Sequence, residues 1–170
     1  LGYVAGSEMT TGVENTIIGS WAGDALLDGS SNVAIGHKAL SGEDGHGKNV
    51  AVGHQALEIQ NAGADAYNVA VGQNAGKVIT TATYATLIGG LAGDALTTGT
   101  DNTAVGYGAL SSEDAHGGNT AVGMLALNTL DAGANANNTA VGADCGRYLT
   151  TGTNNVLMGA FAGDALTTGS

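Results

Sequence analysis

Apolar and polar positions return at nearly constant intervals along the chain. In residues 102–110, NTAVGYGAL, a β-prone Thr-Ala-Val run is followed by a glycine. After two further residues come a small and a large apolar residue, Ala109 and Leu110. The glycine recurs at positions 2, 19, 36, 53, 72, 89, 106, 123, 142 and 159, so two of the intervals are slightly longer than the rest. A nearly fixed period of this length is typical of solenoid repeats.

Each unit predicts a short strand that ends just before the glycine, because its side chains alternate between two faces. A helix is a poor alternative, since a central glycine and a β-branched residue both disfavour it. A unit of this length has room for two short strands and two turns. The sequence therefore predicts an all-β parallel β-solenoid or β-roll of about ten coils.

The residue before each glycine is large and apolar in every unit, so we expect this column to form the hydrophobic spine of the core. Close packing is indicated by an exchange of volumes, since Leu87 replaces the usual alanine where Gly93 replaces the usual leucine. Ile17 with Gly23 and Leu157 with Gly163 repeat the exchange. The Gly72 and Gly142 units lack it, and Val78-Ile79 and Tyr148-Leu149 are the candidates to fill the space.

An asparagine stands at the fourth position before the glycine in almost every unit, and Ala85 is the exception among the full units. Asparagine tolerates left-handed turn geometry, and stacked amides can bond between equivalent positions of successive coils. We therefore expect a structural asparagine ladder formed by Asn15, Asn32, Asn49, Asn68, Asn102, Asn119, Asn138 and Asn155.

Four units together make a longer repeat. Residues 15–84 and 85–154 are identical at about half of their positions, and residues 155–170 begin a third copy. We interpret residues 1–170 as a single repeat array and expect it to be a piece of a longer fibre, because neither end resembles a solenoid cap.

Composition narrows the possible partners. Thirty glycines, no proline and few aromatic residues predict a thin core, in which the single cysteine, Cys145, is a small buried thiol. The net charge of −11 opposes binding to nucleic acid or to anionic lipid. The chain has no run of about 18 apolar residues, so we expect no membrane insertion.

The most site-like groups lie in two equivalent loops, SGEDGHG and SSEDAHG. Clustered carboxylates with a histidine can hold a structural divalent cation, although the spacing matches no established loop motif. A polar surface loop is the alternative. The cation candidates are Glu43, Asp44, His46, Glu113, Asp114 and His116.

Other polar repeats predict no catalytic or cofactor site. Asp24, Asp94 and Asp164 share a GDAL context but lie four coils apart, too far for one ion or one acid–base pair. His37 and His54 occupy the same slot in consecutive coils and are expected to stack about 5 Å apart on an outer face. The chain has no nucleophile–base pair and no phosphate loop, so we expect no enzyme.

An aromatic or leucine side chain recurs at the second position after the glycine, at Trp21, Leu91 and Phe161. Aromatic side chains in this outward slot can stack on sugars or pack in an interface between chains. Both interpretations stay open.

The strings NVAIGHKAL, NVAVGHQAL, NTAVGYGAL and NTAVGMLAL resemble two families of repeats over essentially the whole chain. One is the β-roll head of trimeric autotransporter adhesins. The other, more similar in its longer returns, is the NTAVGY-x-AL repeat of tailed-phage fibres, which often precedes an endosialidase-type chaperone. The resemblance implies an elongated homotrimer in a virion tail fibre or on an extracellular surface. The sugar-stacking interpretation of the aromatic slot adds a host cell-surface glycan as a partner.

The leading hypothesis is therefore a structural fibre segment that acts as a rigid shaft and in host attachment. A bacterial surface adhesin or extracellular filament subunit is the alternative. An ice-binding solenoid is a remote one, because the threonine pairs at 80–81, 97–98, 150–151 and 167–168 are missing from many coils.

Overall fold

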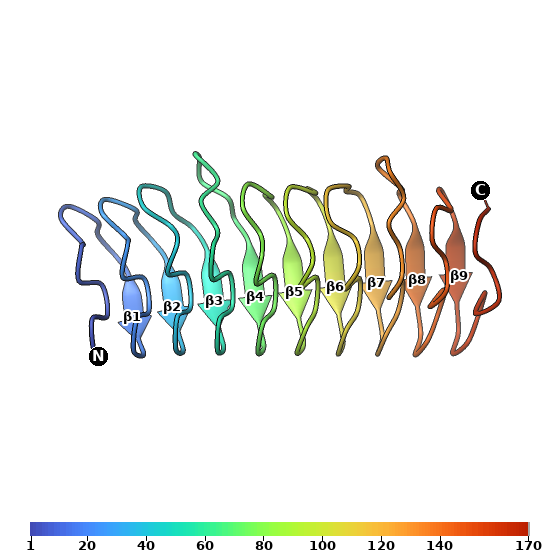
Figure 1. The fold of residues 1–170 in the computed structure, drawn as a ribbon, viewed down its shortest axis with the longest axis horizontal. Helices are drawn as coiled ribbons and strands as arrows, with labels where there is room; N and C mark the ends of the chain where they lie inside the picture. The colour runs from blue at the N-terminus through green and yellow to red at the C-terminus, as the bar shows by residue number, and fades with distance from the viewer. Residues whose placement is uncertain (170) are drawn as a thin grey trace.

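The computed structural model describes residues 1–169 and consists of successive coils stacked along one long axis (Figure 1). Each coil contributes one short strand to a single nine-stranded parallel sheet in chain order. The strands are β1 Thr16–Ile18, β2 Val33–Ile35, β3 Val50–Val52, β4 Val69–Val71, β5 Thr86–Ile88, β6 Thr103–Val105, β7 Thr120–Val122, β8 Thr139–Val141 and β9 Val156–Met158.

The strands pair residue for residue with their copies in the next coil. Thr103 pairs with Thr120 and Val105 pairs with Val122, for example. The prediction of a parallel β-solenoid is confirmed, and no helix occurs in residues 1–169. The nine strands bound about eight turns, fewer than the ten coils predicted.

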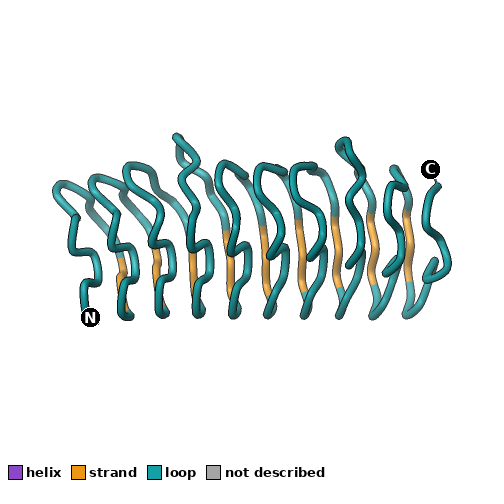
Figure 2. Tube along the Cα trace, in the orientation of Figure 1, coloured by secondary structure: helices purple, strands orange, loops and turns teal. Residues whose placement is uncertain are grey.

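A second strand in each coil was wrongly predicted. The rest of the coil consists of turns and loops (Figure 2), although it is also held by coil-to-coil backbone hydrogen bonds. Lys38 donates to Ser20 at 3.0 Å and Leu40 donates to Ala56 at 3.0 Å, for example. The turns are too tight to leave an extended second segment, because residues with positive φ come in quick succession.

Each coil turns a corner at residues in the left-handed region. In the coil that holds β6 these are Asp101, Gly108 and Leu110, with φ of 59°, 60° and 53°. Trp21 and Phe161 occupy the Gly108 position of their own coils, each with φ of 60°. A corner of this kind lets a chain without proline close a narrow coil.

The repeated glycine is required by the distance between coils. Gly106 has φ of 134°, and a Cβ atom built on it would lie 2.4 Å from the carbonyl oxygen of Gly123 in the next coil. Real Cβ atoms do not approach backbone so closely, so any other residue would push the coils apart. The same contact recurs for each repeated glycine from Gly2 to Gly142 and explains why these positions are glycine.

The core lies on the face of the sheet opposite to the predicted one. The middle residue of each inner strand, such as Ala104 or Leu87, is fully buried, whereas Ile18 and Ile88 before the glycine are 44% and 41% exposed. The predicted spine is therefore wrong, because the narrow coil interior admits alanine at most strand centres and leaves the larger residues outside. The interior also contains Cys145, fully buried as expected.

The predicted exchange of volumes is present in the core. The Cδ2 atom of Leu87 lies 2.8 Å from where a Cβ atom of Gly93 would be, so the leucine occupies the space that a side chain would fill. In the Gly72 unit Ile79 fills part of the gap, since its Cδ1 atom lies 2.9 Å from where a Cβ atom of Gly76 would be. In the Gly142 unit the prediction is wrong, because Leu157 and Leu127 fill the space beside Gly146 and the buried Leu149 does not reach it. Tyr148 is 51% exposed and does not contribute to the filling.

The asparagine ladder is present, but its bonds run from side chain to backbone. Asn32 Oδ1 accepts from the backbone N–H of Asn49 at 3.0 Å, and Asn32 Nδ2 donates to the His46 carbonyl at 3.2 Å. One direct amide-to-amide bond, of 3.0 Å, links Asn155 to Asn138. Ala85 has no amide to offer, so the series is interrupted before Asn102.

Two return loops are longer than the others and project from the stack after β3 and after β7 (Figure 1). They belong to the two longer units of the repeat and contain Gly63 and Gly133. Residues 1–169 contain no helix that is long and apolar enough to cross a membrane.

Candidate functional site

The outer face of the sheet is an uncharged surface that runs over all nine strands. Every strand directs its first and third side chains outward, where they are half-buried or exposed. The first column is Thr16, Val33, Val50, Val69, Thr86, Thr103, Thr120, Thr139 and Val156. The second column is Ile18, Ile35, Val52, Val71, Ile88, Val105, Val122, Val141 and Met158. We call these two columns the outer sheet face.

Large exposed side chains continue this surface on both sides of the strands. Just after the glycine stand Tyr107, 57% exposed, and Met124, 50% exposed. Just before the strands stand Tyr67 and Tyr84, whose rings stack with centroids 5.7 Å apart. The second column is apolar in all nine strands, and an exposed apolar strip of this kind is typical of an interaction site.

The aromatic slot after the glycine borders two separate surface cavities. Trp21, Asp24, Lys38 and Ser41 line a cavity of about 380 Å³ that spans two coils. Trp21 is 40% exposed, and Asp24 Oδ1 is buried without a hydrogen-bond partner among residues 1–169. An aromatic plane with a carboxylate, an amine and a hydroxyl beside it suits a polyhydroxylated ligand.

The second cavity, of about 140 Å³, lies near the other end of the stack and is lined by Phe161, Asp164, Asp144, Arg147 and Tyr148. Arg147 forms an ion pair with Asp144 at 2.9 Å and lies over the Tyr148 ring at 5.4 Å from its centroid. The structure therefore separates Trp21 from Phe161, and Leu91, half-buried, borders neither cavity.

In the first acidic loop the buried carboxylate of Glu43 is satisfied by its own neighbours, although His46 Nδ1 is buried without a hydrogen-bond partner among residues 1–169. Glu43 is fully buried, and its Oε1 atom accepts from the backbone N–H of His46 at 3.1 Å. Its Oε2 atom accepts from Gln60 Nε2 in the next coil at 3.1 Å. Gln60 in turn accepts from Asn68 Nδ2 at 3.2 Å. Each carboxylate oxygen of Glu43 therefore has a donor within the chain.

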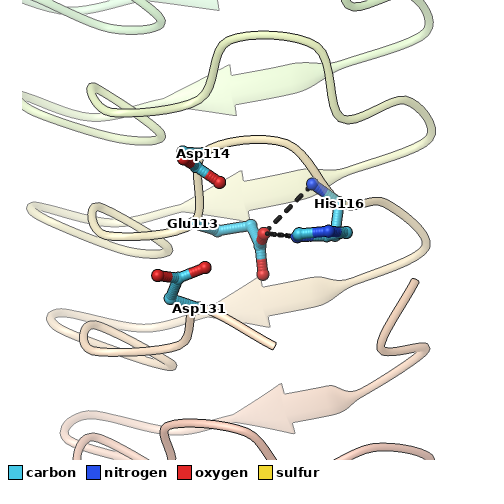
Figure 3. A group of neighbouring side chains, drawn as sticks. All are labelled: Glu113, Asp114, His116 and Asp131. Atoms are coloured by element: carbon cyan, nitrogen blue, oxygen red, sulfur yellow. Dashed lines mark hydrogen bonds and ion pairs between the residues drawn. The ribbon is translucent and has the colours of Figure 1, made fainter. Parts of the chain in front are cut away.

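The second acidic loop brings together four side chains from two coils (Figure 3). Glu113 is fully buried, and its Oε1 atom lies 3.1 Å from the backbone nitrogen and 3.0 Å from the Nδ1 atom of His116. One potential ligand atom from each of Glu113, Asp114, His116 and Asp131 lies within 4.8 Å of the others. Within residues 1–169, no donor reaches hydrogen-bond geometry with Glu113 Oε2.

Burial raises the pKa of both buried glutamates above its ordinary value. For Glu43 the opposing contributions come from the His46 backbone N–H, the His46 charge and Gln60. For Glu113 they come chiefly from His116, with a small one from the backbone N–H of Ala132. In both cases the loss of water around the carboxylate has the larger effect.

The pH dependence of stability should contain a contribution from Glu43. The ordinary pKa of 4.5 is raised in the folded chain, so the folded state holds this proton more tightly than the unfolded state. The free energy of unfolding therefore falls as pH rises from about 4.5 through the folded-state pKa. We expect Glu43→Gln to reduce that fall. The reduction should be about 1.4 kcal/mol for each tenfold difference in proton affinity of Glu43 between the folded and unfolded states.

Urea unfolding of the unmodified chain and of Glu43→Gln from pH 4 to pH 8 measures how the two free energies of unfolding change with pH. Glu8→Gln, at an exposed glutamate, is the control for the loss of one negative charge. A Glu43→Gln profile parallel to that of the unmodified chain would contradict the assignment.

The histidines at 37 and 54 stack as expected, with ring centroids 5.1 Å apart and planes 16° apart. Both are exposed and belong to consecutive coils. The sequence interpretation overlooked Asp131, Gln60 and Lys38, which reach candidate groups of the preceding coil. Each of them stands one short repeat unit after its candidate group in the sequence. Asp131 follows Asp114 in this way, Gln60 follows Glu43, and Lys38 follows Trp21.

Comparison with known proteins finds no matching family model, no matching curated protein and no matching solved structure.

Proposed function

We propose that this chain is a structural segment of a tailed-phage fibre, in which three copies associate through the outer sheet face. The observation that carries the proposal is the continuity of that face: the strands lie in register, each directs two side chains outward, and none of these side chains is charged. The proposed role is mechanical and requires no turnover.

The thin interior limits how much apolar surface one chain can bury by itself. Alanine fills most strand centres, so burial inside the coil removes little apolar surface from water. Association of the outer sheet face would bury the larger valine, isoleucine and methionine side chains as well. A repeat array presents the same strip in every coil, roughly 40 Å long over nine strands, so copies can align along their whole length.

A pair of charge variants tests the association. Val105 lies on the outer sheet face of β6, and Ser112 is exposed in the return loop of the same coil. Light scattering after size-exclusion chromatography should give the mass of three chains for the unmodified protein and for Ser112→Glu. Val105→Glu should reduce it to one chain, because a charge buried between copies is costly.

A monomeric unmodified chain would contradict the proposed trimer. Antibody labelling of whole particles then tests the location independently. Label on virion tails supports the phage fibre, whereas label on bacterial cells without virions favours the alternative, an adhesin or extracellular filament subunit.

Host attachment through sugars is the second part of the proposal, and the Trp21 cavity supports it. Its indole, Asp24, Lys38 and Ser41 provide a stacking plane and hydrogen-bonding groups. We expect Trp21→Ala to lose binding on an array of host-surface glycans while it keeps its oligomeric mass. Loss of the oligomer in the same variant would instead place Trp21 in an interface between chains.

One observation favours the remote alternative, an ice-binding solenoid. Thr86, Thr103, Thr120 and Thr139 follow one another in the first column of the outer sheet face. The row is interrupted, however, because β2, β3 and β4 place valine there. Measurable thermal hysteresis by the purified chain would support ice binding over the fibre.

A further inference from the structure

The buried carboxylate of Glu113 carries a polar atom that residues 1–169 leave without a partner. Glu113 is fully buried, and its Oε2 atom has no hydrogen bond within this part of the chain, since the Ala132 backbone N–H acts on the carboxylate only from outside hydrogen-bond geometry. Leaving a buried carboxylate oxygen unpaired costs free energy. Figure 3 places this carboxylate between the imidazole of His116 and the two aspartates, Asp114 and Asp131.

The internal duplication provides a comparison within the same molecule. In the first copy, Glu43 has the position of Glu113, and Gln60 supplies the donor that its Oε2 atom needs. In the second copy, leucine stands at position 130 where the first has Gln60, and Asp131 stands where the first has Asn61. The second loop has therefore lost a neutral donor and gained a carboxylate.

Both changes favour a cation at the second loop. Three carboxylates converge there, and the imidazole of His116, whose Nδ1 atom lies 3.0 Å from Glu113 Oε1, is the only group among the four side chains that can carry a positive charge. An imidazole together with carboxylates suits first-row transition ions such as Zn²⁺, whereas Ca²⁺ and Mg²⁺ prefer oxygen ligands alone.

The cluster can close around one ion by side-chain rotation. Ligands at roughly 2.1 Å around a tetrahedral ion lie about 3.4 Å from one another. The four ligand atoms lie within 4.8 Å of one another, so no pair has to approach by more than about 1.4 Å. Asp114 and Asp131 are exposed, and their carboxylates can rotate toward Glu113 and His116.

We propose that Glu113, Asp114, His116 and Asp131 form a binding site for a divalent first-row transition-metal ion. The site joins two successive coils, because Asp131 comes from the coil after the one that holds the other three ligands. It is independent of the proposed fibre function, and the ion would clamp the return loops of β6 and β7 together.

Calorimetric titration with ZnCl₂ in a non-coordinating buffer tests the site. His37→Gln and His54→Gln are introduced first, so that His46 and His116 are the only histidines that remain. We expect one ion per chain. Asp131→Asn, which copies Asn61 of the first loop, should weaken binding at least tenfold, a loss at the lower end for altered metal sites.

The converse experiment builds a second site. Gln60→Leu combined with Asn61→Asp gives the first loop the residues of the second, and we expect the stoichiometry to rise to two ions per chain. Circular dichroism and the melting temperature verify that each variant is folded.

Three results would overturn the proposal. These are a titration without binding, an affinity that Asp131→Asn and Glu113→Gln leave unchanged in folded protein, and binding of Ca²⁺ but not of Zn²⁺. A titration without binding would mean that a proton, and not a metal ion, neutralises Glu113.

Discussion

Replacing Gly106 by alanine should lower the free energy of unfolding by roughly 4 kcal/mol or more, the range of the most disruptive single substitutions. The new Cβ atom would meet the Gly123 carbonyl oxygen at 2.4 Å, and φ at this residue is 134°. Neither atom belongs to a flexible side chain, so relief requires the two coils to separate. Separation breaks the hydrogen bonds of several neighbouring residues at once.

A control lies in the long return loop after β7. A Cβ atom on Gly133 would have no atom of residues 1–169 within 4 Å, although φ there is 69°. Gly133→Ala therefore introduces backbone strain, of order 1–3 kcal/mol, without a clash between coils. Urea denaturation of both variants measures the difference, and equal losses would show that the clash has no part in the choice of glycine.

Removing the side chain of Leu87 should cost about 2–5 kcal/mol, the usual range for leucine to alanine in a core. Leu87 is fully buried, and its Cδ atoms lie 2.7 Å and 2.8 Å from the positions of Cβ atoms on Gly76 and Gly93. The glycines cannot fill the vacated space, so the cavity persists. The measurement is again the free energy of unfolding from urea denaturation.

A second substitution, at Gly93, should restore the core volume that Leu87→Ala removes. Gly93 has a φ of 56°, and Leu110 at the equivalent position of the next coil has a φ of 53°, so a leucine fits the backbone there. Gly93→Leu alone should destabilise by overpacking, about 1–3 kcal/mol. Combined with Leu87→Ala it should recover stability, with a coupling of at least about 1 kcal/mol. Additive losses would mean that the two positions do not share one space.

Repeat length, strand positions and the asparagine ladder could be predicted because stacking places each residue beside its own copies. Asn32 bonds to Asn49, and Gly106 meets Gly123, so a repeated residue in the sequence becomes a repeated contact. The histidine stack at 37 and 54 follows from the same rule.

The candidate clusters could be predicted only in part. Glu113, Asp114 and His116 are neighbours in sequence, so their grouping was visible, and Asp131 was missed because it reaches the group from the following coil. The Trp21 cavity was incomplete for the same reason, since Lys38 and Ser41 belong to the next coil.

The sequence by itself determined the period, the parallel order of the strands and the residues that must be small, because each depends on contacts between identical positions. Only the tertiary structure decided which face of the strand lies inside. The alternation of Thr103, Ala104 and Val105 defines two faces of the strand but does not indicate which face is buried. The narrow interior makes the choice, because it admits Ala104 and leaves both larger neighbours outside.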